Sequence, residues 1–182
     1  MPEFDVVDLG PTDHVAEGET APDFTRPLVS DEFWEDRALS TLDGERVVLV
    51  FTTMVGAFPA KYVMTELQDR GVGVDDEGEV VDADGTDGLD ATVVAVSISS
   101  PYEISPFLDD QQLPYGVFSD PTNEVADTYG VVHDLDGMAG ITEPRPAVFV
   151  LDADRTVEYA WVATEWPEMP DYDELEAALS ER

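Results

Sequence analysis

The stretch FTTMVGAFPAKY, residues 51–62, has the arrangement of a site for a reactive side chain. It overlaps the end of the apolar run RVVLVF (46–51) and leads into PAKYVMTELQDRG (59–71), whose apolar spacing predicts an amphipathic helix. A helix start that follows a buried strand presents unpaired N–H groups and a partial positive charge, which lower the pKa of a nucleophile. The loop nevertheless contains no Cys, Ser or His. The sequence therefore predicts a place for chemistry without its usual residue.

Three other side chains near the expected helix start could react without sulfur: Thr53, Lys61 and Tyr62. Lys61 is the only lysine of the chain, and an amine with a depressed pKa can act as a nucleophile or a base. No catalytic partner for Lys61 is evident in the sequence, however. We therefore favour a solvated position on the helix surface for it.

The segment DADGTDGLD (82–90) has some features of a calcium loop. The EF-hand pattern requires acidic residues at positions 1, 3 and 5, Gly at position 6 and Glu at position 12. Counted from Asp82, these last three positions hold Thr86, Asp87 and Val93, so the pattern fails. We predict an acidic surface loop here.

The two histidines, His14 and His133, have no partner at metal-ligand spacing. We expect His14 at the surface and His133 as a cap beyond a helix end. The chain also lacks the G-x-S-x-G elbow and the glycine-rich phosphate loops. No metal and no cofactor are expected.

The charge is extreme: 42 Asp and Glu face eight Lys and Arg, for a net charge of −34. Such self-repulsion destabilises a compact chain in dilute buffer, and molar salt screens it. We interpret the sequence as that of an extreme halophile. An acidic chain cannot neutralise phosphates, which excludes nucleic acid as a partner. No apolar run reaches membrane-spanning length and no signal peptide is evident, so we expect no membrane contact and a cytoplasmic location.

Cysteine is absent from the sequence. No disulfide, thiolate metal site or thiol nucleophile can form within this chain.

Strands alternate with helices, which predicts an α/β fold with a mixed central sheet and helices on both faces. Residues 1–17 form an acidic leader, and 18–182 are expected to fold as a single domain that begins with an edge strand within 18–29. The remaining strands are expected at 46–51, 91–99 and 115–118 and as a hairpin at 146–163; the helices are expected at 59–71, at 100–112, in a segment that ends at Gly130, and at 170–182 with Asp171 as its N-cap.

Three segments carry a resemblance to a known family: GETAPDF near the start, VAVSISSPYEISPFLDDQQLPYGVFSDPTNEVADTYGV in the middle and PAVFVLDADRTVEYAW late in the chain. In their order and spacing, from about Gly18 to Leu179, they resemble the alkyl hydroperoxide reductase/thiol-specific antioxidant branch of the thioredoxin-fold superfamily, the peroxiredoxins. The resemblance implies a thioredoxin-like, peroxiredoxin-type three-layer sandwich. It also implies kinship with antioxidant oxidoreductases.

The resemblance gives the opening loop a meaning, because this superfamily keeps its redox cysteines there. GAFPAK (56–61) can be aligned with the thioredoxin-type pattern W-C-x-P-C-K. Pro59 and Lys61 then match, and Ala57 and Ala60 stand where two cysteines would be.

The peroxiredoxin pattern P-x-x-x-T-x-x-C can be aligned with the same stretch. It places Thr53 at the Pro position, Ala57 at the Thr position and Ala60 at the peroxidatic Cys; a shifted register moves that Cys position to Tyr62 or Val63. In every register the sulfur is missing.

The family also places an arginine near the late hairpin, facing the loop. In EPRPAVF, Pro146 occupies that position and Arg145 stands one residue earlier. A shift of one residue in a strand turns a side chain to the other face, so Arg145 is expected to miss the pocket. Pro146 instead resembles the cis-proline that thioredoxins place beside their dithiol.

Tyr159, Trp161 and Trp166 are expected to cluster on the late hairpin, where packing against the core is their usual role. An exposed subset could form an association face. The candidate partners are a second copy of the chain and a redox-pathway protein.

These observations predict a peroxiredoxin-like protein with a vacated redox loop, consisting of Thr53, Ala57, Pro59, Ala60 and Lys61, that binds a partner or ligand without thiol peroxidase activity. Two alternatives stay open. One is an enzyme that uses a non-thiol group near Lys61, and the other is a Cys-to-Ala form of an active peroxiredoxin.

Overall fold

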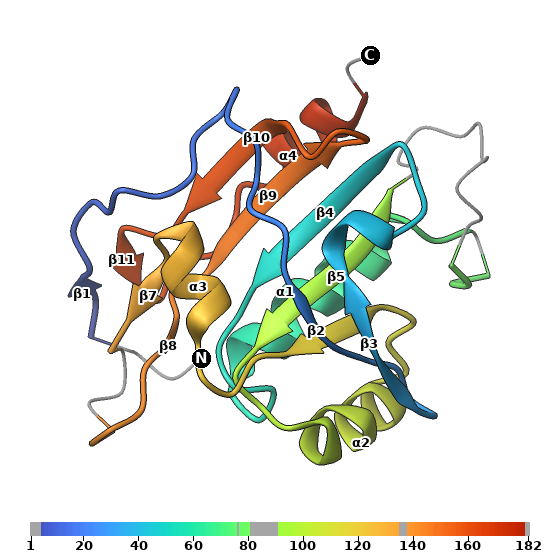
Figure 1. The fold of residues 1–182 in the computed structure, drawn as a ribbon, viewed down its shortest axis with the longest axis horizontal. Helices are drawn as coiled ribbons and strands as arrows, with labels where there is room; N and C mark the ends of the chain where they lie inside the picture. The colour runs from blue at the N-terminus through green and yellow to red at the C-terminus, as the bar shows by residue number, and fades with distance from the viewer. Residues whose placement is uncertain (1–4, 76, 81–90, 135–137, 181–182) are drawn as a thin grey trace.

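The computed structural model describes residues 5–75, 77–80, 91–134 and 138–180. Its centre is a seven-stranded mixed sheet with the order β10-β9-β4-β5-β6-β2-β3 (Figure 1). The pairs β4–β5 and β5–β6 are parallel and the other pairs are antiparallel. The strands are β2 (Thr25–Val29), β3 (Trp34–Ala38), β4 (Arg46–Phe51), β5 (Thr92–Ser97), β6 (Gly116–Ser119), β9 (Ala147–Asp152) and β10 (Val157–Val162).

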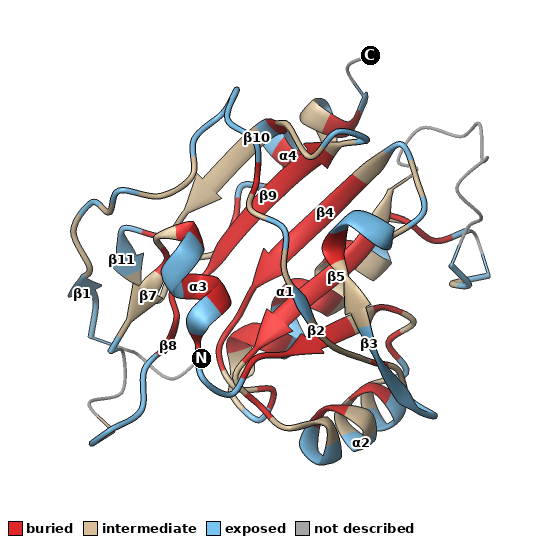
Figure 2. Ribbon diagram, viewed as in Figure 1, coloured by how far each residue is buried: buried red, intermediate tan, exposed pale blue. Residues whose placement is uncertain are grey.

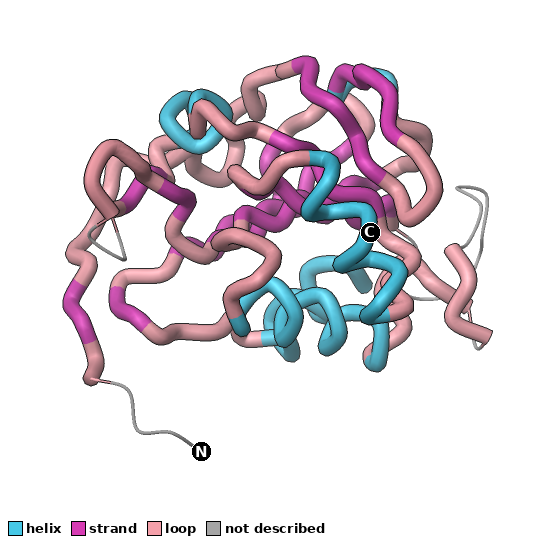
Figure 3. The backbone as a smooth tube through the Cα atoms, turned by 90° about the horizontal axis from the view of Figure 1, so that it is seen from below, coloured by secondary structure: helices cyan, strands magenta, loops and turns pink. Residues whose placement is uncertain are grey.

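Helices cover both faces of this sheet, which confirms the predicted α/β three-layer fold (Figure 3). One face carries α1, α2 and α4, and the other carries α3 and a short 3-10 turn. Their bounds are α1 (Phe58–Asp69), α2 (Pro101–Gln111), α3 (Glu124–Tyr129), α4 (Tyr172–Ser180) and η1 (Leu39–Thr41). The Asp171 carboxylate accepts hydrogen bonds from the N–H groups of Asp173 and Glu174, as expected of the predicted N-cap.

The apolar side chains of β4 pack against the helices on both faces of the sheet. Val48 and Val50 pack on the side of α1, whereas Leu49 and Phe51 pack on the side of α3. Successive side chains of a strand point to opposite faces, so a continuous apolar run is needed where both faces are covered. The central strands β4, β5 and β9 are accordingly buried except at one end of each (Figure 2).

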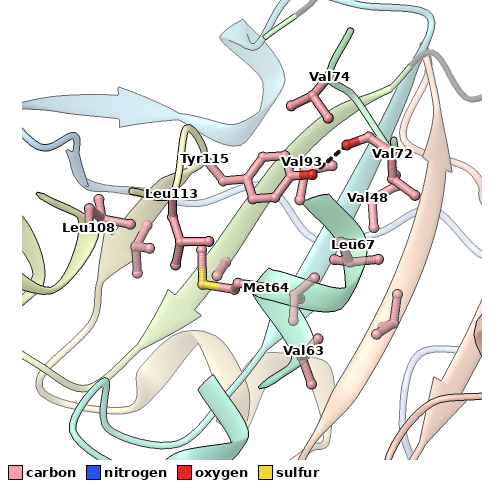
Figure 4. Close-up of a cluster of buried hydrophobic side chains, with 14 of the residues drawn as sticks. Val48, Val63, Met64, Leu67, Val72, Val74, Val93, Leu108, Leu113 and Tyr115 are labelled. Carbon is pink, nitrogen blue, oxygen red and sulfur yellow. Dashed lines mark hydrogen bonds between the residues drawn. The ribbon is translucent and has the colours of Figure 1, made fainter. Parts of the chain in front are cut away.

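On the α1 side, Val63, Met64 and Leu67 of the helix lie against the sheet (Figure 4). Tyr115 closes this cluster, and its hydroxyl donates a hydrogen bond to the Val72 carbonyl at 2.5 Å. Burial raises the pKa of this phenol well above its ordinary value.

The N-terminal segment lies against the domain. β1 (Val7–Asp8) pairs with β11 (Glu165–Trp166), and the Val15 N–H donates to the Tyr129 carbonyl at 3.1 Å. The predicted acidic leader therefore contributes a strand and backbone contacts to the fold.

Arginines join elements that are far apart in the sequence. Each of three arginines forms ion pairs with carboxylates about a hundred residues away: Arg26 with Asp120 at 2.9 Å and Glu124 at 2.8 Å, Arg46 with Glu158 at 2.8 Å, and Arg70 with Asp173 at 2.9 Å and Glu176 at 3.2 Å.

Two sequence-based expectations were wrong. The strand within 18–29 is β2, which lies between β6 and β3 and is not an edge; β3 forms the edge instead. His133 does not cap a helix, because Gly130 ends α3 in a left-handed conformation and His133 lies in β7 (Val132–His133), paired with β8 (Glu143–Pro144).

The predicted acidic loop 82–90 lies outside the described residues. Within the part of the chain that is described, no helix is long and apolar enough to cross a membrane.

Candidate functional site

The expected strand–loop–helix is present at the carboxyl end of β4. The Thr52 N–H donates to the Val96 carbonyl at 3.1 Å and so extends the parallel pairing one residue past the strand. The chain then turns, with the Ala57 N–H donating to the Met54 carbonyl at 2.9 Å. Ala57 is the N-cap of α1, but its methyl group cannot cap the helix.

The residues of the vacated loop differ in burial. Pro59 and Ala60 lie in the first turn of α1 and are buried, and Ala57 is half-buried. Lys61 is exposed, and none of the ion pairs among the described residues includes it. Ala57 at the N-cap and Ala60 in the first turn thus carry methyl groups at the two positions where the thioredoxin-type alignment places sulfur.

Buried serines support this loop from the neighbouring strands. The Ser97 hydroxyl donates to the Thr53 carbonyl at 3.1 Å, and Ser99 Oγ accepts the Val55 N–H at 3.1 Å. The Ser119 hydroxyl donates in turn to the Ser99 carbonyl at 2.7 Å. All three serines lie at the ends of β5 and β6, where parallel strands bring their carboxyl ends to one edge of the sheet.

A buried carboxylate also holds the loop. Glu143, on β8, is 2% exposed, and its Oε2 accepts the Met54 N–H at 3.1 Å. Glu143 and the three serines were not predicted from the sequence as part of the site. The signal for the serines was available, because polar residues directly follow two apolar strands; for Glu143 no local pattern pointed to the loop.

Thr52 and Thr53 are each only 2% exposed, and the Oγ1 atom of each has no hydrogen-bond partner among the described residues. Buried hydroxyls are normally paired, because an unpaired one loses its hydration without compensation. The start of the loop therefore keeps two polar groups at buried positions where apolar side chains are more usual.

The facing residues come from the segment before β9. Ala147 pairs with Phe51, which places Pro146 beside Thr52 at the start of the loop. The resemblance of Pro146 to the thioredoxin cis-proline does not extend to its geometry, because the one cis peptide bond in the described part of the chain is Trp166–Pro167.

The Arg145 guanidinium, 5% exposed, contacts the N-terminal segment. Its Nη1 donates to the Gly10 carbonyl at 2.8 Å and to the Ala163 carbonyl at 3.1 Å. Burial lowers the pKa of Arg145. Pro146 therefore lies at the loop, whereas the Arg145 side chain binds the backbone of the N-terminal segment at Gly10.

Three aromatic rings cluster at the head of α1, and two of them belong to the helix itself. The Phe58 ring centroid lies 5.7 Å from that of Tyr62 and 5.7 Å from that of Trp166 on β11. Tyr62 is 55% exposed. Of the aromatic residues predicted to cluster on the hairpin, Tyr159 and Trp161 pack against the core, and only Trp166 reaches the loop.

Both histidines contact residues of the fold. His14 Nδ1 lies 2.7 Å from the Val15 carbonyl oxygen, and its ring packs edge-on against Phe149. His133 is paired in register with Glu143, and burial together with the nearby Arg145 lowers its pKa. Across the described ranges, no three His, Asp or Glu side chains gather as a metal site.

A central mixed sheet flanked by helices, with a strand–loop–helix connection at the head of its first long helix, defines a thioredoxin-like fold of the peroxiredoxin type. Solved structures agree: peroxidoxin BcpB from Mycobacterium tuberculosis is similar with a TM-score of 0.70 and 23% identity, over 91% of this chain and 97% of that one. AhpC from Enterococcus faecalis gives a TM-score of 0.70 at 16% identity, over 90% and 89% of the two chains. A peroxiredoxin-like protein from Aquifex aeolicus gives 0.66 at 20% identity, over 96% and 90%.

The AhpC/TSA family model matches residues 18–160, and the chain belongs to this family. A search of the curated proteins finds no match to this sequence.

Proposed function

We propose that this protein is a halophilic member of the AhpC/TSA family that binds a partner or a small molecule and has no thiol peroxidase activity. The observation that carries the proposal is the absence of cysteine, together with Ala57 and Ala60 at the head of α1. By kinship, the proposed partner class is a protein of redox metabolism.

The missing activity follows from the chemistry. A thiolate attacks one oxygen of a peroxide, the O–O bond breaks, and the sulfur becomes a sulfenic acid that a second thiol reduces. A methyl group has no electron pair to donate. The exposed amine of Lys61 cannot take over the cycle, because it forms no sulfenic acid for a thiol to reduce.

The binding part of the proposal is supported by the ring cluster of Phe58, Tyr62 and Trp166. Aromatic side chains that expose part of their surface are enriched where proteins associate, because they bury a large area at low cost in conformational entropy. The cluster borders the vacated loop, so a bound molecule would contact both.

Peroxide consumption in molar KCl, with a thioredoxin-type donor, tests the chemistry. We expect no turnover above the background of the donor alone. Catalytic turnover by the cysteine-free chain would overturn this part of the proposal.

Binding is tested by capture of partners from a halophile extract in molar KCl. The Tyr62→Ala variant should lose the captured species, whereas Tyr102→Ala, which removes a still more exposed ring on α2, should retain it. Equal capture by both variants would exclude the ring cluster as the binding face.

The lone lysine favours a second candidate, an enzyme that uses the Lys61 amine. Its exposed position in the first turn of α1 lets a reagent reach it. Amine labelling measured against pH distinguishes the two functions: an ordinary lysine profile supports the binding protein, and a strongly depressed pKa supports the enzyme.

A further inference from the structure

One edge of the central sheet is open. β3 is the last strand beyond β2, and Trp34, Glu35 and Asp36 are exposed along it (Figure 2). Phe33, at the start of the strand, is 59% exposed, and the Trp34 ring packs edge-on against Tyr102 of α2. An open edge of this kind is a template for another strand.

The pairing with β2 determines which backbone groups point outward. At the two ends of the ladder, the Leu39 N–H donates to Phe24 and the Ser30 N–H donates to Phe33, each at 2.9 Å. Hydrogen-bonded and non-bonded pairs alternate along antiparallel strands. Counting inward from both ends gives the same result: the N–H and C=O groups of Trp34, Asp36 and Ala38 face away from β2.

Pro27 agrees with this assignment. It lies opposite Asp36 and has no N–H, which is acceptable because this pair exchanges no hydrogen bond. The Ala38 carbonyl accepts the Thr41 hydroxyl at 2.7 Å and keeps a second lone pair.

We propose that β3 pairs antiparallel with β3 of a second copy of this chain, about a two-fold axis at Asp36. In this register Asp36 meets Asp36, and Trp34 meets Ala38, so that every outward-facing residue of one strand meets an outward-facing residue of the other. Trp34 then covers the small side chain of Ala38 in the partner strand.

Charge complementarity selects the second copy as the occupant of this edge. Glu35 and Arg37 share the other face of β3, and their charged groups lie 3.6 Å apart within the chain. The two-fold axis sets Glu35 of each copy opposite Arg37 of the other, which adds two cross-strand pairs of opposite charge. A shift of the register by two residues in either direction instead pairs Glu35 with Glu35 or Arg37 with Arg37.

The central Asp36 pair opposes association at low salt. Like charges that face each other across strands are destabilising, and salt at about 1 M shortens the screening length to about 3 Å. The same salt screens the long-range repulsion between two chains of net charge −34 more than it screens the Glu35–Arg37 pairs in contact, so KCl should strengthen dimerisation.

Charge exchange tests the register by sedimentation of the full chain in molar KCl. Glu35→Arg alone and Arg37→Glu alone should each weaken the dimer about tenfold, because both cross-strand pairs become repulsive. The double variant Glu35→Arg/Arg37→Glu should restore it. A mixture of the two single variants should form a mixed dimer tighter than either variant alone.

Two variants of Asp36 should act in opposite directions. Asp36→Pro removes the outward N–H as well as the like-charge pair and should still abolish the dimer, whereas Asp36→Asn removes the like-charge pair alone and should tighten the dimer. Circular dichroism checks that each variant is folded. The control is Asp154→Arg, in the exposed turn between β9 and β10, which matches the charge change of Glu35→Arg and should leave the dimer unchanged.

A monomeric wild-type chain in molar KCl would overturn the proposal. A dimer that survives Asp36→Pro and both single charge reversals would also overturn it, because the association must then use another face, such as β10 or the ring cluster.

Discussion

Replacing the unpartnered hydroxyls at the start of the loop should stabilise the protein. Thr52 and Thr53 bury Oγ1 atoms that have no hydrogen-bond partner among the described residues. Thr→Val keeps the shape of the side chain and removes the polar atom. Leaving a buried polar group unsatisfied costs about 1–3 kcal/mol, so each change should raise the free energy of unfolding by about 1 kcal/mol. For a chain of this length that corresponds to about 2–4 °C in the melting temperature.

Calorimetry or urea unfolding in molar KCl measures the change. Thr92→Val is the control for the same chemical change at a hydrogen-bonded, half-buried threonine, since the Thr92 hydroxyl donates to the Asp43 carbonyl at 2.6 Å. Loss of this bond should lower the free energy of unfolding by about 1 kcal/mol. The two classes of variant should therefore shift the transition in opposite directions.

A loss of stability in Thr53→Val as large as that in Thr92→Val would refute the reasoning, because it would show that the Thr53 hydroxyl is hydrogen-bonded in solution. The expected gain would mean that the loop keeps polar groups at the expense of stability. Proteins keep such groups mainly where they serve a function.

Three further predictions follow from buried polar groups. Burial and the nearby Arg145 lower the pKa of His133, so the unfolded chain binds this proton more readily than the folded chain. Stability should therefore decrease as the pH falls below about 6.5, and His133→Gln should flatten that slope in urea unfolding. Arg145→Met should free the segment around Gly10 and raise its hydrogen exchange about tenfold, without comparable change in the central strands. Tyr115→Phe removes the buried hydrogen bond to Val72 and should cost about 1–2 kcal/mol in the same unfolding assay.

Elements whose residues are buried on both faces could be predicted closely from the sequence. The run RVVLVF coincides with β4, because a strand covered by two layers needs apolar side chains at every position. β3 was missed, since an open edge allows the polar sequence WEDRA to form a strand with no apolar alternation. β2 was mistaken for an edge because it contains Pro27, whose missing N–H is harmless opposite Asp36.

The site was predicted only where it is local in sequence. The loop and the head of α1 lie within about a dozen residues, and both were located from their pattern. The supporting groups are remote: Ser99 is 44 residues from Val55, and Glu143 is 89 residues from Met54. No spacing rule links such positions, because the sheet topology alone brings them together.

The chain should tolerate mutation of its acidic residues better than mutation of the arginines that join distant elements. It has seven Arg and one Lys against 42 acidic residues. Arg26 and Arg70 each pair with two or more carboxylates, so their loss would leave like charges facing one another, and Arg46 joins Glu158 of β10 to the Leu179 carbonyl of α4. Most acidic residues could be substituted by other polar residues with little structural effect, whereas these few arginines could not.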